Sequence, residues 1–354
     1  MVPFIPKVIG LDIPILAIAL GSWYLIRNNC GLVANPVPGA LNKDIESMTY
    51  KIEQIVECEN YLGESPVWDV ESGMFYWVDG TGRRKGKDNI FRLNPETDKV
   101  ETRSIPDHDI GALALRKDGG LVMAVDDGFY FYDFDTENLD LIHKIEADQP
   151  RTRLNDGKVD RRGRFVAGGM DDQEELDICG LWRLDPDLSV TQIGGGIICT
   201  NGPSWSPDDC TFYVTCTFQD IMWAYDYDIE TGALSNQREF VSTKDIPGVC
   251  DGSTVDVEGC VWTAELRTGE IVRRTPDGEE ERRIGMPVNN VTSVMFGGDN
   301  LDEIYVTSMA RIDHPGAEHH DTFVVETKPQ FGAGSVFKVT GLGIQGVPEP
   351  RFGG

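Results

Sequence analysis

The chain has 354 residues, of which 40% are hydrophobic and 26% are charged, as in ordinary soluble globular proteins. Its 32 basic and 59 acidic residues give a formal net charge of −27, which argues against nucleic-acid binding because phosphate binding requires clustered Lys and Arg. The one dense basic run, within residues 83–87, lacks the features of a phosphate-binding loop, and we interpret it as a solvated hairpin loop.

The first 47 residues differ in kind from the rest of the chain. Residues 8–26 are mostly apolar and long enough to cross a bilayer, although Asp12 and Pro14 interrupt the first third. This segment could act as a signal peptide, as a membrane tether or as a tail packed on the following domain. We therefore divide the chain into a leader and linker, 1–47, and one domain, 48–354. We expect the domain to be cytoplasmic unless the leader anchors or exports it.

From Met48 onward, short segments rich in Val, Ile, Phe, Tyr and Trp alternate with turns of Gly, Asp, Pro and Asn, which predicts an all-β domain. Six times, an apolar landmark residue precedes a polar turn and a β-rich run, at intervals of 41 to 50 residues. The landmarks are Trp68, Leu115, Val159, Trp205, Val255 and Phe296. This period is that of a four-stranded propeller blade, whereas a pair of β-sandwiches has no such shared period. We predict a six-bladed β-propeller.

Equivalent positions of the six blades meet at the central channel of a propeller. The residues four positions before the landmarks are Glu64, Gly111, Asn155, Asn201, Asp251 and Thr292. Four of these side chains are carboxylates or amides, while Gly111 has no side chain and Thr292 has a small polar one, which would leave space for a substrate. An all-oxygen set with two carboxylates suits Ca²⁺, Mg²⁺ or Mn²⁺, and suits Zn²⁺ less well without His or Cys.

A structural alternative exists for several of these residues. Asn201-Gly202, Asp156-Gly157 and Asp251-Gly252 are also common turn dipeptides. Four polar residues at one phase of the repeat are difficult to attribute to turns, and Glu64 is not a turn residue. Arg153 adds a cation beside the same position; it could hold substrate hydroxyls or pair with a surface acid.

Other chemistries have little support. The eight cysteines form no CxxC pair, which favours buried thiols in a reducing compartment and leaves a Cys210–Cys216 disulfide open. The five histidines show no metal or triad spacing, and the chain has no Gly-x-Ser-x-Gly elbow for a nucleophilic serine.

Five segments together carry a family resemblance. They are Leu62–Trp68, Arg153–Asp160, Asn201–Asp208, Asp251–Asp256 and Phe296–Ser308. From about residue 50 to Pro350, the chain resembles the senescence marker protein, gluconolactonase and regucalcin family. The resemblance implies a six-bladed propeller hydrolase that opens sugar lactones with one divalent metal.

The resemblance also implies roles for individual residues. Glu64, Asn201 and Asp251 would bind the metal, and Arg153 and Asn155 would contact the substrate. Asp251 would be the proton acceptor as well. The family's further substrate-binding acid has no clear counterpart in residues 171–175.

Our hypothesis is therefore a lactonase that acts on a small-molecule sugar lactone, with a metal-activated water and Asp251 as general base. Two alternatives stay open, since a fold does not determine a substrate. One is hydrolysis of phosphotriesters or other esters at the same site. The other is a calcium-binding propeller without catalysis. No feature predicts whether the chain self-associates.

Overall fold

The computed structural model of the chain describes residues 19–20, 23–28, 31–36, 50–80, 88–310 and 331–354. The chain divides into two compact units, Met1–Ser47 and Met48–Gly354. In the first unit, β1 (Ala19–Leu20), β2 (Trp23–Asn28) and β3 (Gly31–Pro36) form an antiparallel sheet. Most of the apolar segment 8–26 lies outside the described residues. Within the described ranges, no helix is long and apolar enough to span a bilayer.

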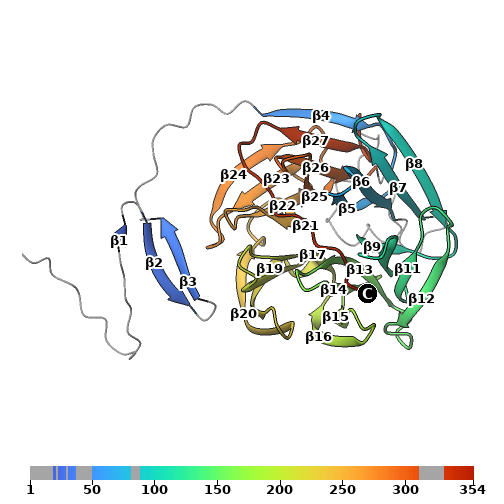
Figure 1. Cartoon of the computed structure of the whole chain (residues 1–354), viewed down its shortest axis with the longest axis horizontal. Helices are drawn as coiled ribbons and strands as arrows, with labels where there is room; N and C mark the ends of the chain where they lie inside the picture. Colours follow the sequence, from blue (N-terminus) through green and yellow to red (C-terminus); the bar gives the residue numbers. More distant parts are fainter. Residues whose placement is uncertain (1–18, 21–22, 29–30, 37–49, 81–87, 311–330) are drawn as a thin grey trace, which may run out of the picture. The chain divides into compact units, whose positions relative to one another are not determined.

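The second unit consists of six antiparallel four-stranded sheets around one axis, which confirms the predicted six-bladed β-propeller (Figure 1). Blade one contains β5 (Gly63–Asp69), β6 (Met74–Asp79), β7 (Asp88–Asn94) and β8 (Lys99–Ile105). Blade two contains β9 (Ile110–Leu115), β10 (Leu121–Val125), β11 (Gly128–Tyr132) and β12 (Leu139–Lys144). Blade three contains β13 (Thr152–Val159), β14 (Phe165–Asp171), β15 (Cys179–Leu184) and β16 (Val190–Ile197). Blades four and five contain β17 (Thr200–Trp205), β18 (Thr211–Cys216), β19 (Ile221–Asp228) and β20 (Ala233–Ser242); β21 (Val249–Val255), β22 (Val261–Leu266), β23 (Glu270–Arg274) and β24 (Glu280–Gly285). A 3₁₀ turn, η1 (Thr217–Gln219), follows β18.

Blade six closes the ring with strands from both ends of the unit. It contains β25 (Val291–Gly297), β26 (Glu303–Ser308), β27 (Val336–Thr340) and β4 (Lys51–Val56). The outermost strand, β4, pairs with β27 in antiparallel register, with Ile52 opposite Val339. The first strand of the unit therefore completes its last blade, so that the blades form a closed ring.

Apolar residues of neighbouring blades form the core. The rings of Phe75 and Tyr305, from blades one and six, stack with centroids 4.7 Å apart. Phe129 and Phe165 join blades two and three edge to face, with ring centroids 5.7 Å apart. Inner strands are buried along their length, as in β21, whereas outer strands such as β8 expose alternate residues. The second strand β10 is also buried along its length, which explains its continuous apolar sequence.

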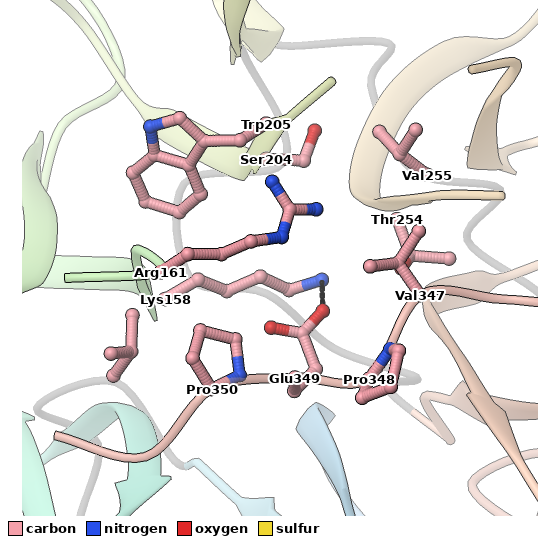
Figure 2. Close-up of a pocket in the computed structure, with 11 residues that line it drawn as sticks. Lys158, Arg161, Ser204, Trp205, Thr254, Val255, Val347, Pro348, Glu349 and Pro350 are labelled. Atoms are coloured by element: carbon pink, nitrogen blue, oxygen red, sulfur yellow. Dashed lines mark hydrogen bonds and ion pairs between the residues drawn. The ribbon is translucent and has the colours of Figure 1, made fainter. Parts of the chain in front are cut away.

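The last residues form a strap, residues 342–354, across the end of the propeller where the inner strands finish. Its backbone accepts one hydrogen bond from the N–H of Val257 and donates to the carbonyl oxygens of Leu115 and Gly163. These three partners belong to three different blades. Glu349 of the strap lies beside Lys158, with Oε1 3.3 Å from Nζ (Figure 2). The opposite end of the central channel, where the inner strands begin, holds the predicted site residues.

Candidate metal centre and substrate site

β-bulges interrupt all six inner strands at the same position of the repeat, and four of these bulges hold the predicted carboxylate and amide residues. The register with the neighbouring strand shifts between Glu64 and Val67, Leu154 and Gly157, Asn201 and Ser204, and Cys250 and Ser253. A bulge bends its strand and re-aims the side chains around it, and bulges are common beside active sites. The Asn-Gly and Asp-Gly dipeptides therefore lie in bulged strands and not in turns, and Gly202 has the positive φ, 56°, that glycine allows.

The structure brings the predicted residues together. The carboxyl groups of Glu64 and Asp251 lie close enough to shift each other's pKa. Glu64 also lines a small cavity with Arg153 and Asn155. Asn155 Nδ2 donates to Asn201 Oδ1 at 2.9 Å, which joins blades three and four. The five residues thus form one continuous cluster at the start of the inner strands.

Burial and mutual repulsion raise the pKa values of the carboxyl groups in this cluster. Loss of solvation raises the pKa of Glu64 well above its usual range, and repulsion from Asp251 and Asp156 raises it further. The pKa of Asp251 is raised for the same reasons, first by burial and then by the charge of Asp156. Glu64 is half-buried and Asp251 is buried, and two neighbouring carboxylates with so little access to water need a proton or a cation between them. The pair, with the amide oxygen of Asn201 nearby, fits a hard divalent cation.

Asp156 is a third buried acid that the sequence analysis treated only as part of a turn dipeptide. Its two carboxylate oxygens accept hydrogen bonds from the backbone N–H groups of Gly157 and Gly202, each at 2.7 Å. Burial raises the pKa of Asp156, and these two N–H groups partly offset that rise. Because Gly202 follows Asn201, this contact fixes the bulge that carries the Asn201 side chain.

Arg153 is buried within the site, so that its alternative role as a surface arginine is wrong. Its side chain is 8% exposed. Nη1 donates to Asn155 Oδ1 at 2.8 Å, and Nη2 lies 2.8 Å from Met170 Sδ. Nε lies 3.5 Å from Asp172 Oδ1. Asp172 is therefore an acid of the 171–175 stretch that faces this arginine.

Gly111 and Thr292, the two small residues among the six equivalent positions, have packing roles. A Cβ atom at Gly111 would lie 2.1 Å from the carbonyl oxygen of Asn155, so only glycine lets β9 approach β13 this closely. The Thr292 hydroxyl is fully buried and donates to the carbonyl oxygen of Gly63 at 2.5 Å. Gly111 therefore allows close packing of strands instead of simply leaving space for a substrate.

Asp171 orders the loop that carries Asp172. Its carboxylate accepts hydrogen bonds from Arg151 Nε at 2.5 Å and from the N–H groups of Glu175 and Leu176 at 2.9 and 2.8 Å. Burial alone would raise the pKa of Asp171, but Arg151 and the backbone donors outweigh it and lower the pKa to about 2. The ionised carboxylate is the form that holds the loop.

The lowered pKa of Asp171 predicts a specific acid sensitivity. Because the folded pKa lies below the usual 3.8, its contribution to stability is present above pH 3.8 and is lost as the pH falls towards 2. We expect Asp171→Asn to lower the melting temperature at pH 7 and to flatten its fall between pH 4 and 2, as measured by thermal unfolding across that range. An Asp187→Asn control at an exposed turn should change the neutral-pH melting temperature little, and equal effects of the two changes would contradict the assignment.

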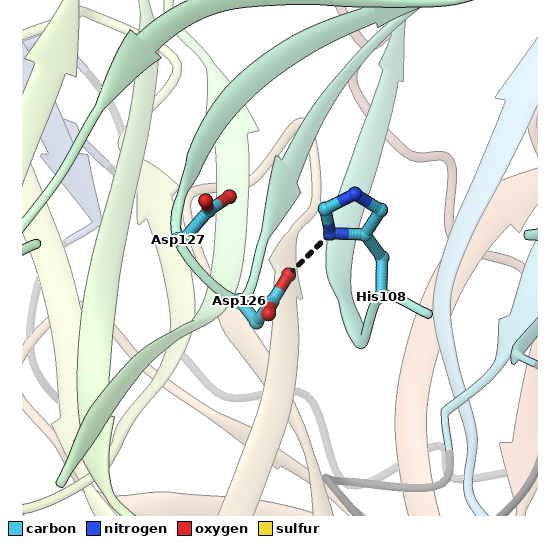
Figure 3. Close-up of side chains that lie close together, drawn as sticks. All are labelled: His108, Asp126 and Asp127. Carbon is cyan, nitrogen blue, oxygen red and sulfur yellow. Dashed lines mark hydrogen bonds and ion pairs between the residues drawn. The ribbon is translucent and has the colours of Figure 1, made fainter. Parts of the chain in front are cut away.

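One histidine lies beside two acids in the fold, although the histidines show no metal spacing in the sequence. Figure 3 shows His108 beside Asp126 and Asp127, with Nδ1 of His108 2.8 Å from Asp126 Oδ1. The ligand atoms of these three residues lie within 4.8 Å of one another. Asp127, however, already accepts hydrogen bonds from Lys144 and Tyr130, both at 2.6 Å. His108 precedes β9, whereas Asp126 and Asp127 lie between β10 and β11. The spacing of the three residues in the sequence therefore does not indicate that they lie together.

The remaining sequence expectations concern cysteines and basic residues. Cys179, Cys199, Cys216, Cys250 and Cys260 are free and buried. The thiol of Cys216 is therefore not paired with Cys210. The basic run of residues 83–87 and the His319-His320 pair lie outside the described residues.

Comparison with known proteins places the chain in a family. Residues 62–310 match the SMP-30/Gluconolactonase/LRE-like region. Regucalcin of Xenopus laevis is 34% identical over 310 residues, which are 86% of this chain and 99% of that protein. The structure of a calcium-binding protein, regucalcin, from Agrobacterium tumefaciens aligns with a TM-score of 0.76 and 26% identity over 86% of this chain and 97% of that chain. A luciferin-regenerating enzyme aligns equally well, with a TM-score of 0.76 and 28% identity over 86% and 99%. The chain therefore belongs to the SMP-30/gluconolactonase/LRE-like family.

Proposed function

We propose that this protein is a divalent-cation-dependent hydrolase that opens sugar lactones to the corresponding aldonic acids. Membership of the family supports a lactonase-type or calcium-binding role. The observation that carries the finer proposal is that two carboxyl groups, of half-buried Glu64 and buried Asp251, lie near each other and beside the joined amides of Asn155 and Asn201. This arrangement supports one cation held by Glu64, Asn201 and Asp251, of the Ca²⁺, Mg²⁺, Mn²⁺ or Zn²⁺ kind.

The side chains divide the work of hydrolysis between them. A bound cation would polarise the lactone carbonyl and make a nearby water more acidic. Asp251 accepts the proton of the attacking water and returns it to the ring oxygen as the C–O bond breaks, which yields the hydroxy acid. Arg153 and Asn155 bind the sugar hydroxyls, and the guanidinium steadies negative charge on the carbonyl oxygen.

A calcium-binding propeller without catalysis is the second candidate. The relatives that favour it are regucalcins, one of which is described as a calcium-binding protein. In that case, the cation would only neutralise Glu64 and Asp251 and so stabilise the fold. The two candidates predict the same binding site and differ only in turnover.

Removal of the cation separates the two candidates. We expect a chelated sample to lose hydrolysis of glucono-δ-lactone, because neutralised carboxyl groups alone cannot activate water, and to recover it with at least one of the four cations. Acid release at constant pH measures the turnover, and the same buffers without protein correct for spontaneous hydrolysis. A melting temperature that rises with Ca²⁺ while no cation supports turnover would instead identify a binding protein.

A further inference from the structure

A chain of hydrogen bonds runs through the candidate metal centre in a single direction. Arg153 Nη1 donates to Asn155 Oδ1 at 2.8 Å, and Asn155 Nδ2 donates to Asn201 Oδ1 at 2.9 Å. Asn201 Nδ2 donates to Thr217 Oγ1 at 2.8 Å, and the Thr217 hydroxyl donates to the carbonyl oxygen of Cys250 at 3.0 Å. The chain therefore passes from blade three through blade four to blade five.

The two ends of this chain fix its direction. A guanidinium can only donate hydrogen bonds, and a backbone carbonyl can only accept them. Asn155 Nδ2 also donates to the carbonyl oxygen of Thr200 at 2.8 Å, so only one orientation of the Asn155 amide satisfies both of its neighbours. At the far end, the proton of the Thr217 hydroxyl is directed to Cys250, which leaves the oxygen of that hydroxyl to accept from Asn201. The Asn201 amide therefore holds its nitrogen towards Thr217 and its oxygen towards Asn155.

The orientation of the Asn201 amide decides whether it can bind a cation. A hard divalent cation binds the oxygen of a carboxamide, whereas the amide nitrogen carries two hydrogens and has no acceptor capacity. The oxygen has two lone pairs, so it can accept from Asn155 and still bind an ion. An inverted amide would direct N–H groups at the cation and would remove the oxygen ligand that accompanies Glu64 and Asp251.

Thr217 is itself held between the two strands that carry proposed ligands. It is the first residue of η1 and is 3% exposed. Its N–H donates to the carbonyl oxygen of Cys199 at 3.2 Å, two residues before Asn201. Its hydroxyl reaches the carbonyl oxygen of Cys250, one residue before Asp251. One residue therefore joins the backbone segments beside two of the three proposed ligands and also contacts one ligand side chain directly.

The neighbouring thiol cannot replace the Thr217 hydroxyl. Cys199 Sγ lies 3.7 Å from Asn201 Nδ2, but a thiol sulfur is only a weak acceptor. Without the hydroxyl, the buried amide nitrogen would keep this weak contact alone, and the Asn201 side chain would gain freedom to rotate or invert. Groups that orient a metal ligand in this way typically contribute about tenfold to hundredfold to metal affinity.

We propose that Thr217 is a positioning residue of the cation site, whose hydroxyl directs the carboxamide oxygen of Asn201 towards the cation without touching the cation itself. The inference rests on the cation site of the proposed function and does not depend on lactone turnover. It applies equally to a lactonase and to a calcium-binding propeller. The hydroxyl of Thr217, and not the size of its side chain, is the group on which cation affinity depends.

Calorimetric titration of matched threonine variants with Mn²⁺ and with Ca²⁺ tests this assignment. The binding event that belongs to the site is the one that Glu64→Gln abolishes. Thr217→Val keeps the shape of the side chain but removes the hydroxyl, and should weaken the Kd of this event by about tenfold or more. Thr217→Ser keeps the hydroxyl, and its Kd should stay within about threefold of wild type.

Thr215→Val is the matched control, because it makes the same chemical change two residues away in the chain. Thr215 lies opposite Asn201 in the pairing of β17 with β18 and is 1% exposed. Its Oγ1 has no hydrogen-bond partner in the part of the chain that the structure describes. Loss of this hydroxyl should therefore leave the Kd within about threefold of wild type.

Thermal unfolding shows which variants are folded, and Thr217→Ala replaces Thr217→Val in the comparison with Thr217→Ser if the valine variant does not fold. A Kd that weakens only when the Thr217 hydroxyl is removed supports the proposal. A wild-type Kd in Thr217→Val, or an equal loss in Thr217→Ser or Thr215→Val, overturns the proposal while the cation site stands. Absence of any Glu64-dependent binding event in the wild-type protein overturns the cation site and the inference together.

Discussion

Asp251→Asn and Glu64→Gln are each expected to reduce lactone turnover by at least about a thousandfold while leaving the protein folded. Both changes keep the shape of the site, and Asp251→Asn removes the group that accepts the proton of the attacking water. They also remove one negative charge from the cation-binding pair. Because burial and repulsion make both carboxyl groups costly to ionise, neutral amides at these positions are compatible with the fold.

Three measurements on each variant distinguish loss of chemistry from loss of structure. Hydrolysis of glucono-δ-lactone gives the rate, calorimetric titration gives cation affinity, and thermal unfolding reports stability. Glu258→Gln serves as a matched control, since the side chain of Glu258 is 60% exposed in an outer position. Wild-type turnover in either site variant, or equal loss in the control, would show that the cluster is not the catalytic site.

Phe352→Ala is expected to have the largest effect on stability, with a loss of about 3–5 kcal/mol in the free energy of unfolding. Phe352 is fully buried and belongs to the apolar cluster between blades two and three. Its backbone N–H donates to Leu115 O at 2.8 Å, and its carbonyl accepts from Lys117 at 2.9 Å. Truncation of the Phe352 side chain leaves a cavity beneath the strap, where the strap crosses the end of the propeller.

Phe331→Ala provides the same chemical change without burial, because Phe331 is 86% exposed. Denaturant unfolding should give a free energy within about 0.5 kcal/mol of wild type for this control. Similar unfolding free energies for Phe352→Ala and the control would contradict the role of the strap. Activity per folded molecule should change little in Phe352→Ala, because the strap lies at the opposite end of the channel from Asp251.

The fold was predictable because each blade repeats one local pattern. The landmark residues, such as Trp68 and Trp205, end inner strands whose apolar residues face neighbouring blades, and the polar turn after each is required to reverse the chain. A six-fold repeat of that pattern leaves few architectures other than a propeller. The family was predictable from motifs in the same strands.

The site was predictable only in part. The repeat predicted that Glu64, Asn155, Asn201 and Asp251 share one end of the channel, but their individual roles stay predictions. The pairings of Asp156 with Gly202 and of Asp172 with Arg153 join residues of different strands or loops, and no local pattern encodes such contacts. The bulges could not be predicted for the same reason. A bulge is a mismatch in the pairing of two strands, and the sequence of one strand alone does not encode it.

The position of a bound ion decides whether Glu64, Asn201 and Asp251 form one metal site. Crystals of the chain equilibrated with Mn²⁺ should show one strong anomalous-scattering peak in the central channel. We predict that this peak lies about 2.0–2.6 Å from oxygen atoms of Glu64, Asn201 and Asp251. A channel without a peak at millimolar Mn²⁺, or an ion bound only elsewhere, such as at His108, would contradict the account.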